Sequence, residues 1–248
     1  ILTGLTPPPG YFPKNVLMNI QGYESLDTVM ERGNKALSAA AFEAAANETG
    51  ALVLDTRDAD EFAKGFIPNS VNIGLDGSFA QWVGEMIPDI KQPILLVTNA
   101  GHEEEAVIRL SRVGYDGAIG YLEGGFASWE KAGKEKDTAK RITAEEFAKN
   151  YDAENRLLVD VRKKSEFDSE HVLGAVNIPL NEINRHLAEF PKDKPFVLQC
   201  AGGYRSMIAT SILKQRGWEN FADIRGGFTE LKKTGIPVSD YVCPSTML

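Results

Sequence analysis

Leu52-Val53-Leu54-Asp55-Thr56-Arg57 recurs in this chain as Leu157-Leu158-Val159-Asp160-Val161-Arg162, displaced by 105 residues (157 minus 52). Three further motifs recur in the same order: Glu61-Phe62 as Glu166-Phe167, Val71-Asn72-Ile73 as Val176-Asn177-Ile178, and Gly124-Gly125-Phe126 as Gly226-Gly227-Phe228. The first two keep the displacement of 105 residues, whereas the last is displaced by 102 (226 minus 124). Motifs that recur in one order indicate a duplicated domain, here with a small length difference in its middle.

Each copy of the repeat alternates short apolar strands with helical patterns. In the second copy, residues 157–161 and 196–199 are the clearest buried strands. Residues 206–215 then carry apolar side chains at helical spacing, and Gly217 is the expected stop of that helix. Such alternation is typical of a parallel sheet flanked by helices. We therefore expect an α/β fold with two domains, each a mainly parallel sheet flanked by helices.

The 248 residues are enough for two domains that each bury a core of their own. We expect the degenerate first copy at residues 37–135 and the second copy at residues 140–242, joined by the polar segment 134–140. Residues 1–36 form a lead-in segment with too few apolar side chains for an independent core, and its Pro7-Pro8-Pro9 should be extended. Because the chain begins at Ile1, we interpret it as a piece of a longer protein.

Composition excludes several function classes. A formal charge of -8 gives no basic surface for nucleic acid, and no apolar run approaches the roughly 18 residues that cross a bilayer. We therefore expect neither a nucleic-acid nor a membrane partner. The only cysteines are Cys200 and Cys243, which argues against a disulfide scaffold and favours a reducing, cytoplasmic location.

One loop carries residues suited to covalent chemistry. Cys200 lies between a buried strand and a helix start, where open α/β sheets place their ligands. Unpaired N–H groups and the positive end of a helix dipole favour an anion there, so the thiolate should be stabilised. Consecutive glycines allow a tight, anion-binding turn. We expect Cys200 to be the nucleophile and the rest of the loop to bind substrate: Ala201, Gly202, Gly203, Tyr204, Arg205 and Ser206.

The second copy resembles the rhodanese family, whose active loop begins with a nucleophilic cysteine and closes with an arginine before a helix. The resemblance rests on several ordered motifs: Asp160-Val161-Arg162, Glu166-Phe167, His171-Val172-Leu173-Gly174-Ala175, Asn177-Ile178-Pro179, the loop at Cys200, and Gly226-Gly227-Phe228. It implies transfer of a sulfane sulfur from thiosulfate or a persulfide to a thiol or another nucleophile, through a persulfide on Cys200. It implies no cofactor and no metal.

Two other functions stay open at this point. The domains could form a binding module, in which Cys200 acts as a passive persulfide or redox sensor without rapid turnover. The same loop could also hydrolyse phosphate esters or reduce arsenate, but related phosphatases are expected to need one more residue between the cysteine and Arg205.

The first copy departs from the pattern at the reactive positions. Aligned on Pro93 and Pro195, Thr98 stands where the second copy has its cysteine, and Glu103 stands where it has its arginine. A threonine hydroxyl lacks a thiol's nucleophilicity, and the run of acidic residues 103–105 would repel an anionic donor. We expect the first domain to be catalytically silent.

The remaining polar and aromatic residues receive structural interpretations. Asp160 and Arg162 are expected to support the loop from beneath without touching substrate. His102, His171 and His186 lack the spacing of a metal site, Cys243 is expected to be a solvent-exposed bystander, and the tryptophans should be core or interface residues: Trp82, Trp129 and Trp218.

The lead-in segment carries a second, shorter resemblance. Residues 4–16, followed by Asn19 and Gly22-Tyr23, look like the tail that follows a metallo-β-lactamase-fold domain in persulfide dioxygenase to rhodanese fusions. This resemblance implies that the longer protein has a fused or associated non-haem iron domain of that fold. It implies no metal site within these 248 residues.

Overall fold

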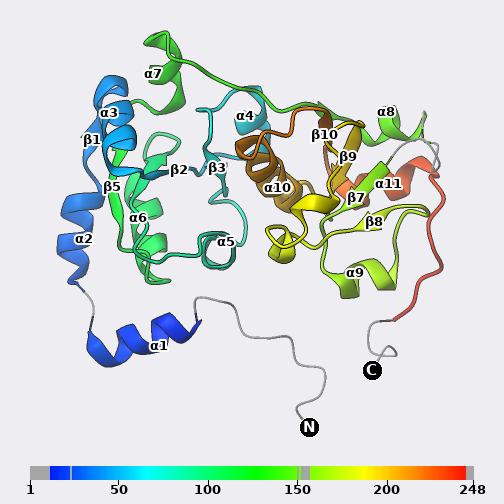
Figure 1. The fold of residues 1–248 in the computed structure, drawn as a ribbon, viewed down its shortest axis with the longest axis horizontal. Coiled ribbons are helices and arrows are strands. Elements are labelled where there is room, and N and C mark those ends of the chain that lie inside the picture. Colours follow the sequence, from blue (N-terminus) through cyan, green and yellow to red (C-terminus); the bar gives the residue numbers. More distant parts are fainter. Residues whose placement is uncertain (1–11, 23, 150, 152–156, 244–248) are drawn as a thin grey trace. The chain divides into compact units, whose positions relative to one another are not determined.

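The computed structural model describes residues 12–22, 24–149, 151 and 157–243, and it divides the chain into two compact units. Unit 1 is Ile1–Asp137 and unit 2 is Thr138–Leu248. Each unit contains one five-stranded sheet in which every hydrogen-bonded pair of strands is parallel (Figure 1). The predicted α/β fold with two parallel sheets is confirmed.

Unit 1 contains these elements in chain order: α1 (Phe12–Gln21), α2 (Leu26–Gly33), β1 (Ala36–Leu37), α3 (Ala39–Thr49), β2 (Leu52–Asp55), α4 (Ala59–Lys64), β3 (Val71–Asn72), α5 (Phe79–Met86), β4 (Ile94–Val97), α6 (Glu103–Ser111), β5 (Ala118–Leu122) and α7 (Gly125–Lys131). In the lead-in, α2 packs against α6 and β5, with Val29 buried. Pro7-Pro8-Pro9 lies outside the described residues.

Unit 2 contains β6 (Arg141–Ile142), α8 (Ala144–Ala148), β7 (Leu157–Asp160), α9 (Lys164–Ser169), β8 (Val176–Asn177), the 3-10 turns η1 (Leu180–Glu182) and η2 (Leu187–Glu189), β9 (Phe196–Gln199), α10 (Tyr204–Gln215), β10 (Phe221–Ile224), α11 (Gly227–Leu231) and η3 (Lys232–Thr234). The helix predicted at 206–215 begins two residues earlier, because Gly203 adopts a left-handed conformation and starts the helix at Tyr204.

The two sheets have the same topology. Their strand orders are β1-β5-β4-β2-β3 and β6-β10-β9-β7-β8, so corresponding strands occupy corresponding places. In each sheet the strand of the repeated Leu-x-x-Asp motif pairs in register with the strand that precedes the reactive loop: Leu52 with Ile94, and Leu157 with Phe196. The repeat in the sequence is therefore a repeat of a whole fold.

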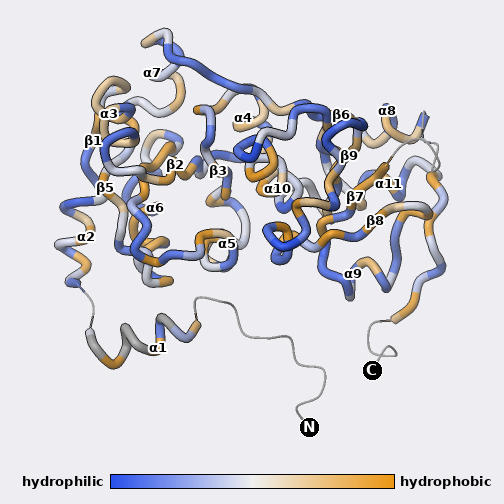
Figure 2. The backbone as a smooth tube through the Cα atoms, in the orientation of Figure 1, coloured by the Kyte–Doolittle hydropathy of each residue, from blue (hydrophilic) through white to orange (hydrophobic). Residues whose placement is uncertain are grey.

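Both faces of each sheet are covered, as a parallel sheet requires. In β2 the neighbours Val53 and Leu54 point to opposite faces, and both are buried. In unit 2 the corresponding residues Leu158 and Val159 are completely buried. Figure 2 shows that β7 is made mostly of hydrophobic residues. At the carboxyl end of each sheet, the loop after β4 in unit 1 and the loop after β9 in unit 2 leave the strands.

Among the described residues, no helix combines the length and the apolar character needed to cross a membrane.

Candidate active site

The reactive loop of unit 2 leaves the carboxyl end of the central strand β9. Cys200 follows Gln199 directly and is buried, with 1% of its surface exposed. The chain then turns through Gly203, whose φ of 97° is a left-handed conformation that favours glycine. The Gly203 N–H donates a hydrogen bond to the Cys200 Sγ, at an N–S distance of 3.1 Å. The loop thus directs a backbone donor at the sulfur, where negative charge can be bound.

The start of α11 fixes the carbonyl groups of this loop. The Phe228 N–H donates to the Cys200 carbonyl oxygen at 2.7 Å, and the Thr229 N–H donates to the Ala201 carbonyl oxygen at 3.1 Å. The Thr229 hydroxyl donates to the same Ala201 oxygen at 2.9 Å. These bonds engage the loop carbonyls with α11.

Gly227 makes this close approach possible. Its φ is 54°, and a Cβ added there would lie 2.2 Å from the Cys200 carbonyl oxygen. Any side chain would therefore collide with the loop backbone. The repeated Gly-Gly-Phe motif is explained by this contact.

A buried ion pair lies beneath the turn. The Arg141 Nε donates to the Asp223 Oδ2 at 2.8 Å, and both side chains are almost fully buried. A Cβ added to Gly203 would lie 2.9 Å from the Arg141 Nη2. Gly203 is therefore required for its left-handed conformation, and a larger residue there would also displace the end of the Arg141 side chain.

A second buried network supports the loop from the neighbouring strand. The Arg162 Nε donates to both carboxylate oxygens of Asp160, at 3.0 and 2.9 Å, and the Gln199 Nε2 donates to Asp160 Oδ2 at 2.7 Å. The Arg162 guanidinium also lies 4.1 Å from the centre of the Phe228 ring. Burial raises the pKa of Asp160, and the Arg162 guanidinium opposes that rise. This network links the strand before Cys200 to the helix that holds its carbonyl.

Arg205, at the end of the loop, forms an ion pair with Glu166. Its Nη1 and Nη2 donate to the two carboxylate oxygens of Glu166, at 2.6 and 2.8 Å. The hydrogen bonds from Arg205 hold the pKa of Glu166 below its ordinary value, against the effect of burial. Burial acts to lower the pKa of Arg205, but Glu166 and the neighbouring Cys200 raise it. The guanidinium stays charged, and α9 positions it through Glu166.

The other predicted loop residues differ in accessibility. Gly202 is exposed, and Ala201 and Tyr204 are half-buried, so these three can meet a ligand. Ser206 is completely buried, and its hydroxyl oxygen has no hydrogen-bond partner among the described residues. The structure therefore places Ser206 inside the first turn of α10, beneath the loop surface.

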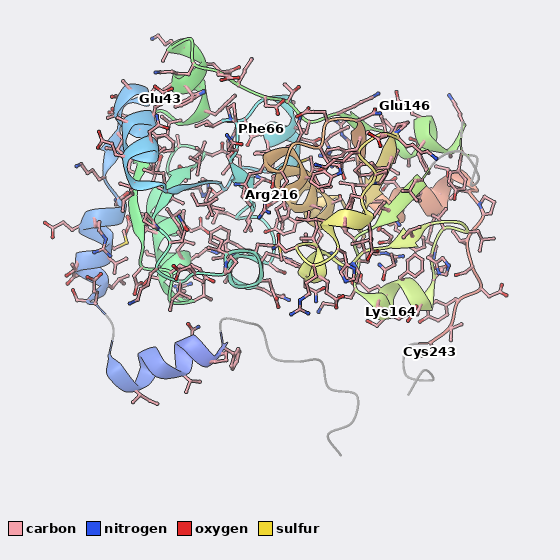
Figure 3. All side chains as sticks on the ribbon, viewed as in Figure 1. Glu43, Phe66, Glu146, Lys164, Arg216 and Cys243 are labelled. Atoms are coloured by element: carbon pink, nitrogen blue, oxygen red, sulfur yellow. The ribbon has the colours of Figure 1, made fainter. Side chains whose placement is uncertain are left out.

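The remaining sequence candidates lie elsewhere. His171 stacks on the ring of Phe167, and His186 lies beside Glu182 and Glu189. Cys243 is exposed, in the segment after the last described helix (Figure 3). In the part of the chain that the structure describes, no group of three or more His, Cys, Asp and Glu side chains could hold a metal ion.

The corresponding loop of unit 1 keeps the support and loses the reactive groups. The Arg57 Nε donates to both Asp55 carboxylate oxygens, as Arg162 does to Asp160 in unit 2. Thr98 follows β4 at the position of the cysteine and is buried. Glu103 accepts a hydrogen bond from the Gly101 N–H at 2.9 Å, at the position where unit 2 has its arginine.

Sequence reasoning missed three contributors to the site: Arg141, Glu166 and Thr229. Glu166 belongs to a repeated motif, but its partner is 39 residues away, and only the folded structure brings the two side chains together. Thr229 directly follows a repeated Gly-Gly-Phe motif at the start of a helix, which was a usable signal. Nothing in the sequence pairs Arg141 with the turn.

Comparison with known proteins identifies both copies. The model of the rhodanese-like domain family matches residues 38–132 and 143–234. The chain is 38% identical over 89 residues to the uncharacterized protein YqhL of Bacillus subtilis (strain 168), covering 36% of this chain and 69% of that protein. It is 33% identical over 87 residues to a sulfurtransferase of Allochromatium vinosum, covering 35% of this chain and 81% of that protein.

Among solved structures, a rhodanese-related protein of Thermoplasma volcanium is 29% identical, with a TM-score of 0.37, and the match covers 40% of this chain and 97% of that chain. The family model does not extend over residues 1–36, so the fused metal-dependent domain stays a prediction. The two matched ranges take in all of each sheet except its edge strand, β1 or β6, and they include the cysteine loop; the chain belongs to the rhodanese-like domain family.

Proposed function

We propose that unit 2 is a sulfurtransferase that carries a sulfane sulfur on Cys200, and that unit 1 takes no part in the chemistry. In the first step the Cys200 thiolate attacks the outer sulfur of thiosulfate. The S–S bond of thiosulfate breaks, sulfite leaves with the bonding electrons, and a persulfide remains on Cys200. In the second step an acceptor thiolate attacks the terminal sulfur of that persulfide. The acceptor leaves as a persulfide, and Cys200 returns as the thiolate.

The observation that carries this proposal is the donor aimed at the sulfur. The Gly203 N–H lies 3.1 Å from Cys200 Sγ, while α11 binds the loop carbonyls that would otherwise repel an anion. Negative charge stays on sulfur in the thiolate, in the persulfide and in the transfer step between them. Fixed backbone donors stabilise such charge without reorganising.

Arg205 supports the first step. Its charge lies near Cys200, and its ion pair with Glu166 holds the guanidinium in one place. Thiosulfate carries two negative charges, so a fixed cation beside the loop favours its binding. A persulfide donor with less charge depends less on Arg205.

Unit 1 lacks the groups that this chemistry needs. Thr98 cannot form a persulfide, and Glu103 replaces the cation beside it. We assign unit 1 no step of the transfer.

Steady-state transfer from thiosulfate to a small thiol tests the proposal, with sulfite release as the readout. Wild type should turn over, Cys200→Ser should not, and Cys243→Ser should match wild type, because Cys243 is an exposed cysteine outside the loop. Loading of Cys200 without turnover would favour the sensor function instead. Hydrolysis of a phosphate ester that exceeds sulfur transfer would favour a phosphatase.

A further inference from the structure

Unit 1 contains a pocket of about 370 Å³ at the carboxyl end of its sheet. Its position corresponds to that of the reactive loop in unit 2. The lining comes from α4 and the residues on either side of it, from the loop after β4, and from α7 with the glycine before it: Arg57, Glu61, Lys64, Gly65, Thr98, Asn99, Ala100, Gly124, Gly125, Phe126, Ala127 and Glu130. Small-molecule sites have volumes of roughly 300–1,000 Å³, so this pocket is large enough for a small metabolite.

A buried polar atom in the lining has no partner within the protein. Thr98 is 2% exposed, and its Oγ1 makes no hydrogen bond with any described residue. The hydroxyl of the nearby Thr56, by contrast, donates to the Val97 carbonyl at 3.2 Å. Buried hydroxyl groups are normally bonded, and this one lies in a pocket lining, where a ligand could supply the partner.

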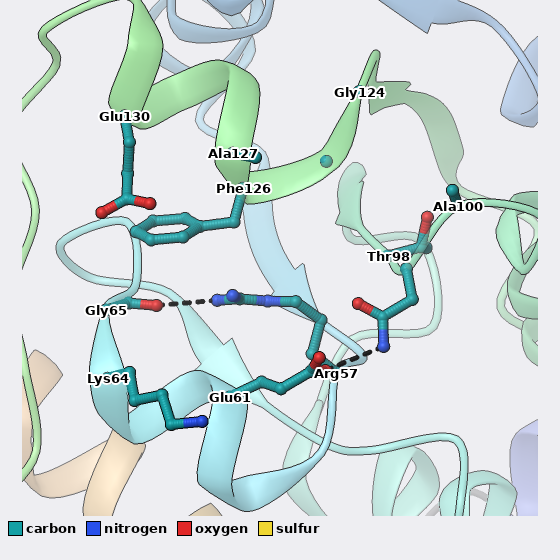
Figure 4. A pocket seen from close by; sticks show the side chains of 12 residues that line it. Arg57, Glu61, Lys64, Gly65, Thr98, Ala100, Gly124, Phe126, Ala127 and Glu130 are labelled. Atoms are coloured by element: carbon teal, nitrogen blue, oxygen red, sulfur yellow. Dashed lines mark hydrogen bonds between the residues drawn. The ribbon is translucent and has the colours of Figure 1, made fainter.

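Two lining residues of opposite charge, Glu61 and Lys64, do not pair with each other. Glu61 and Lys64 are three residues apart on α4, a spacing at which opposite charges usually pair. Glu61 instead accepts a hydrogen bond from the Asn99 Nδ2 at 2.8 Å, drawn as a dashed line in Figure 4. Lys64 makes no ion pair or hydrogen bond with any residue that the structure describes. The Lys64 ammonium is thus left for a ligand, and the Glu61 carboxylate, which accepts one bond from an uncharged amide, has no cationic partner in the described residues.

The other charges of the lining are already balanced. Arg57 pairs with Asp55, and its guanidinium lies 4.4 Å from the centre of the Phe126 ring, beside which Figure 4 shows it. Its hydrogen bonds with the described residues use Nε and Nη2, which leaves Nη1 available to a ligand. Glu130 pairs with Lys136 at 2.6 Å. The net charge of the pocket is therefore close to zero, with its two signs separated.

Unit 2 does not share this pattern. Its counterparts of Lys64 and Glu130 are Ser169 and Lys232, and its Glu166 is bound by Arg205. The separated charges are a feature of unit 1 alone.

We propose that this pocket binds a zwitterionic amino acid or short peptide. The ligand's ammonium faces Glu61, its carboxylate faces Lys64 and the Arg57 Nη1, and one of its polar atoms bonds the Thr98 hydroxyl. Phe126 supplies an apolar wall for the remaining carbon atoms. Glu61 repels a ligand that is only an anion, and Lys64 repels one that is only a cation. Each should therefore bind less tightly than a molecule with both charges. This binding role goes beyond the proposed sulfur transfer and does not depend on it.

Titration calorimetry of the whole 248-residue chain tests the proposal with four probes. L-Alanine and L-alanyl-L-alanine carry both charges, N-acetyl-L-alanine lacks the ammonium, and L-alaninamide lacks the carboxylate. L-Alanine or L-alanyl-L-alanine should bind at least tenfold more tightly than both N-acetyl-L-alanine and L-alaninamide. Amide NMR shifts on titration should lie at residues 98–100 and 124–127.

Variants assign the binding to the pocket. Lys64→Met and Glu61→Gln should each weaken binding of the zwitterion at least tenfold. Lys91→Met should not, because Lys91 is an exposed lysine before the amino end of β4. Cys200→Ser should bind like wild type. Equal binding of all four probes, no binding of any, wild-type affinity in Lys64→Met, or shifts confined to unit 2 would each overturn the proposal.

Discussion

Gly227→Ala perturbs the site without touching any reactive group. The added methyl group would lie 2.2 Å from the Cys200 carbonyl oxygen, and real Cβ contacts are essentially never shorter than 3.0 Å. Either the loop or the start of α11 must therefore move by about 0.8 Å. The same movement stretches the bond from the Phe228 N–H, which is 2.7 Å long in the native protein. The sulfur of Cys200 is then displaced from the Gly203 N–H.

The expected loss of activity follows from that displacement. A misplacement of about 1 Å in an active site costs on the order of a hundredfold in rate. We expect Gly227→Ala to load sulfur from thiosulfate about a hundredfold more slowly than wild type in a single turnover. The variant should also lose about 1–2 kcal/mol of stability, because alanine is strained in the left-handed conformation.

Gly217→Ala separates these two effects. Gly217 also has a left-handed φ, of 84°, but nothing lies within 4 Å of its added Cβ. It should lose similar stability in urea unfolding and keep its loading rate within about threefold, since it adds no displacement of the loop. Intact-protein mass at successive times gives the rate, at a temperature where circular dichroism shows each variant folded. Wild-type loading by a folded Gly227→Ala would refute the role assigned to this contact.

Three further outcomes are expected. Asp160→Asn should cost about 3–5 kcal/mol in urea unfolding, because it leaves the buried Arg162 guanidinium without its counter-charge; a cost below about 1 kcal/mol would contradict the network. Because Arg205 lowers the pKa of Glu166, wild type should be more stable than Glu166→Gln at neutral pH. That advantage should fall as the pH drops below the ordinary carboxyl value of 4.5, and melting temperatures that differ equally from pH 7 to pH 3 would contradict it. Thr98→Cys, made in the Cys200→Ser variant, should gain no sulfur from thiosulfate. A gain of sulfur measured by mass would show that unit 1 is not catalytically silent.

The repeat predicted most of the fold. Three of the four recurring motifs fall on a strand or just after one, because a parallel sheet repeats both its buried strands and the turns that follow them. The fourth, Glu61-Phe62, lies in α4, and its copy lies in α9. The motif Leu157-Leu158-Val159-Asp160 became β7, in register with the strand that leads to Cys200. The order of strands within each sheet did not follow from the repeat, because hydrogen-bonded neighbours are far apart in the chain.

The candidate site was predicted less completely. The sequence indicated Cys200 and the glycines, because thiol chemistry and tight turns need particular residue types. It did not indicate that Glu166 binds Arg205, since that ion pair depends on two helices that meet only in the folded domain. It also presented unit 1 as a scaffold with a repelling acidic loop. The structure shows that Glu103 accepts a hydrogen bond from a backbone N–H of its own loop, and that Thr98, Asn99 and Ala100 of that loop line a pocket.

The most direct test of the central claim is the intact mass of the protein after incubation with thiosulfate, compared with that of Cys200→Ser. We predict that wild type gains one sulfur atom, that a thiol acceptor removes it, and that the variant gains none. A wild-type protein that gains no sulfur, or a Cys200→Ser protein that gains as much as wild type, would contradict the assignment of Cys200 as the sulfur carrier.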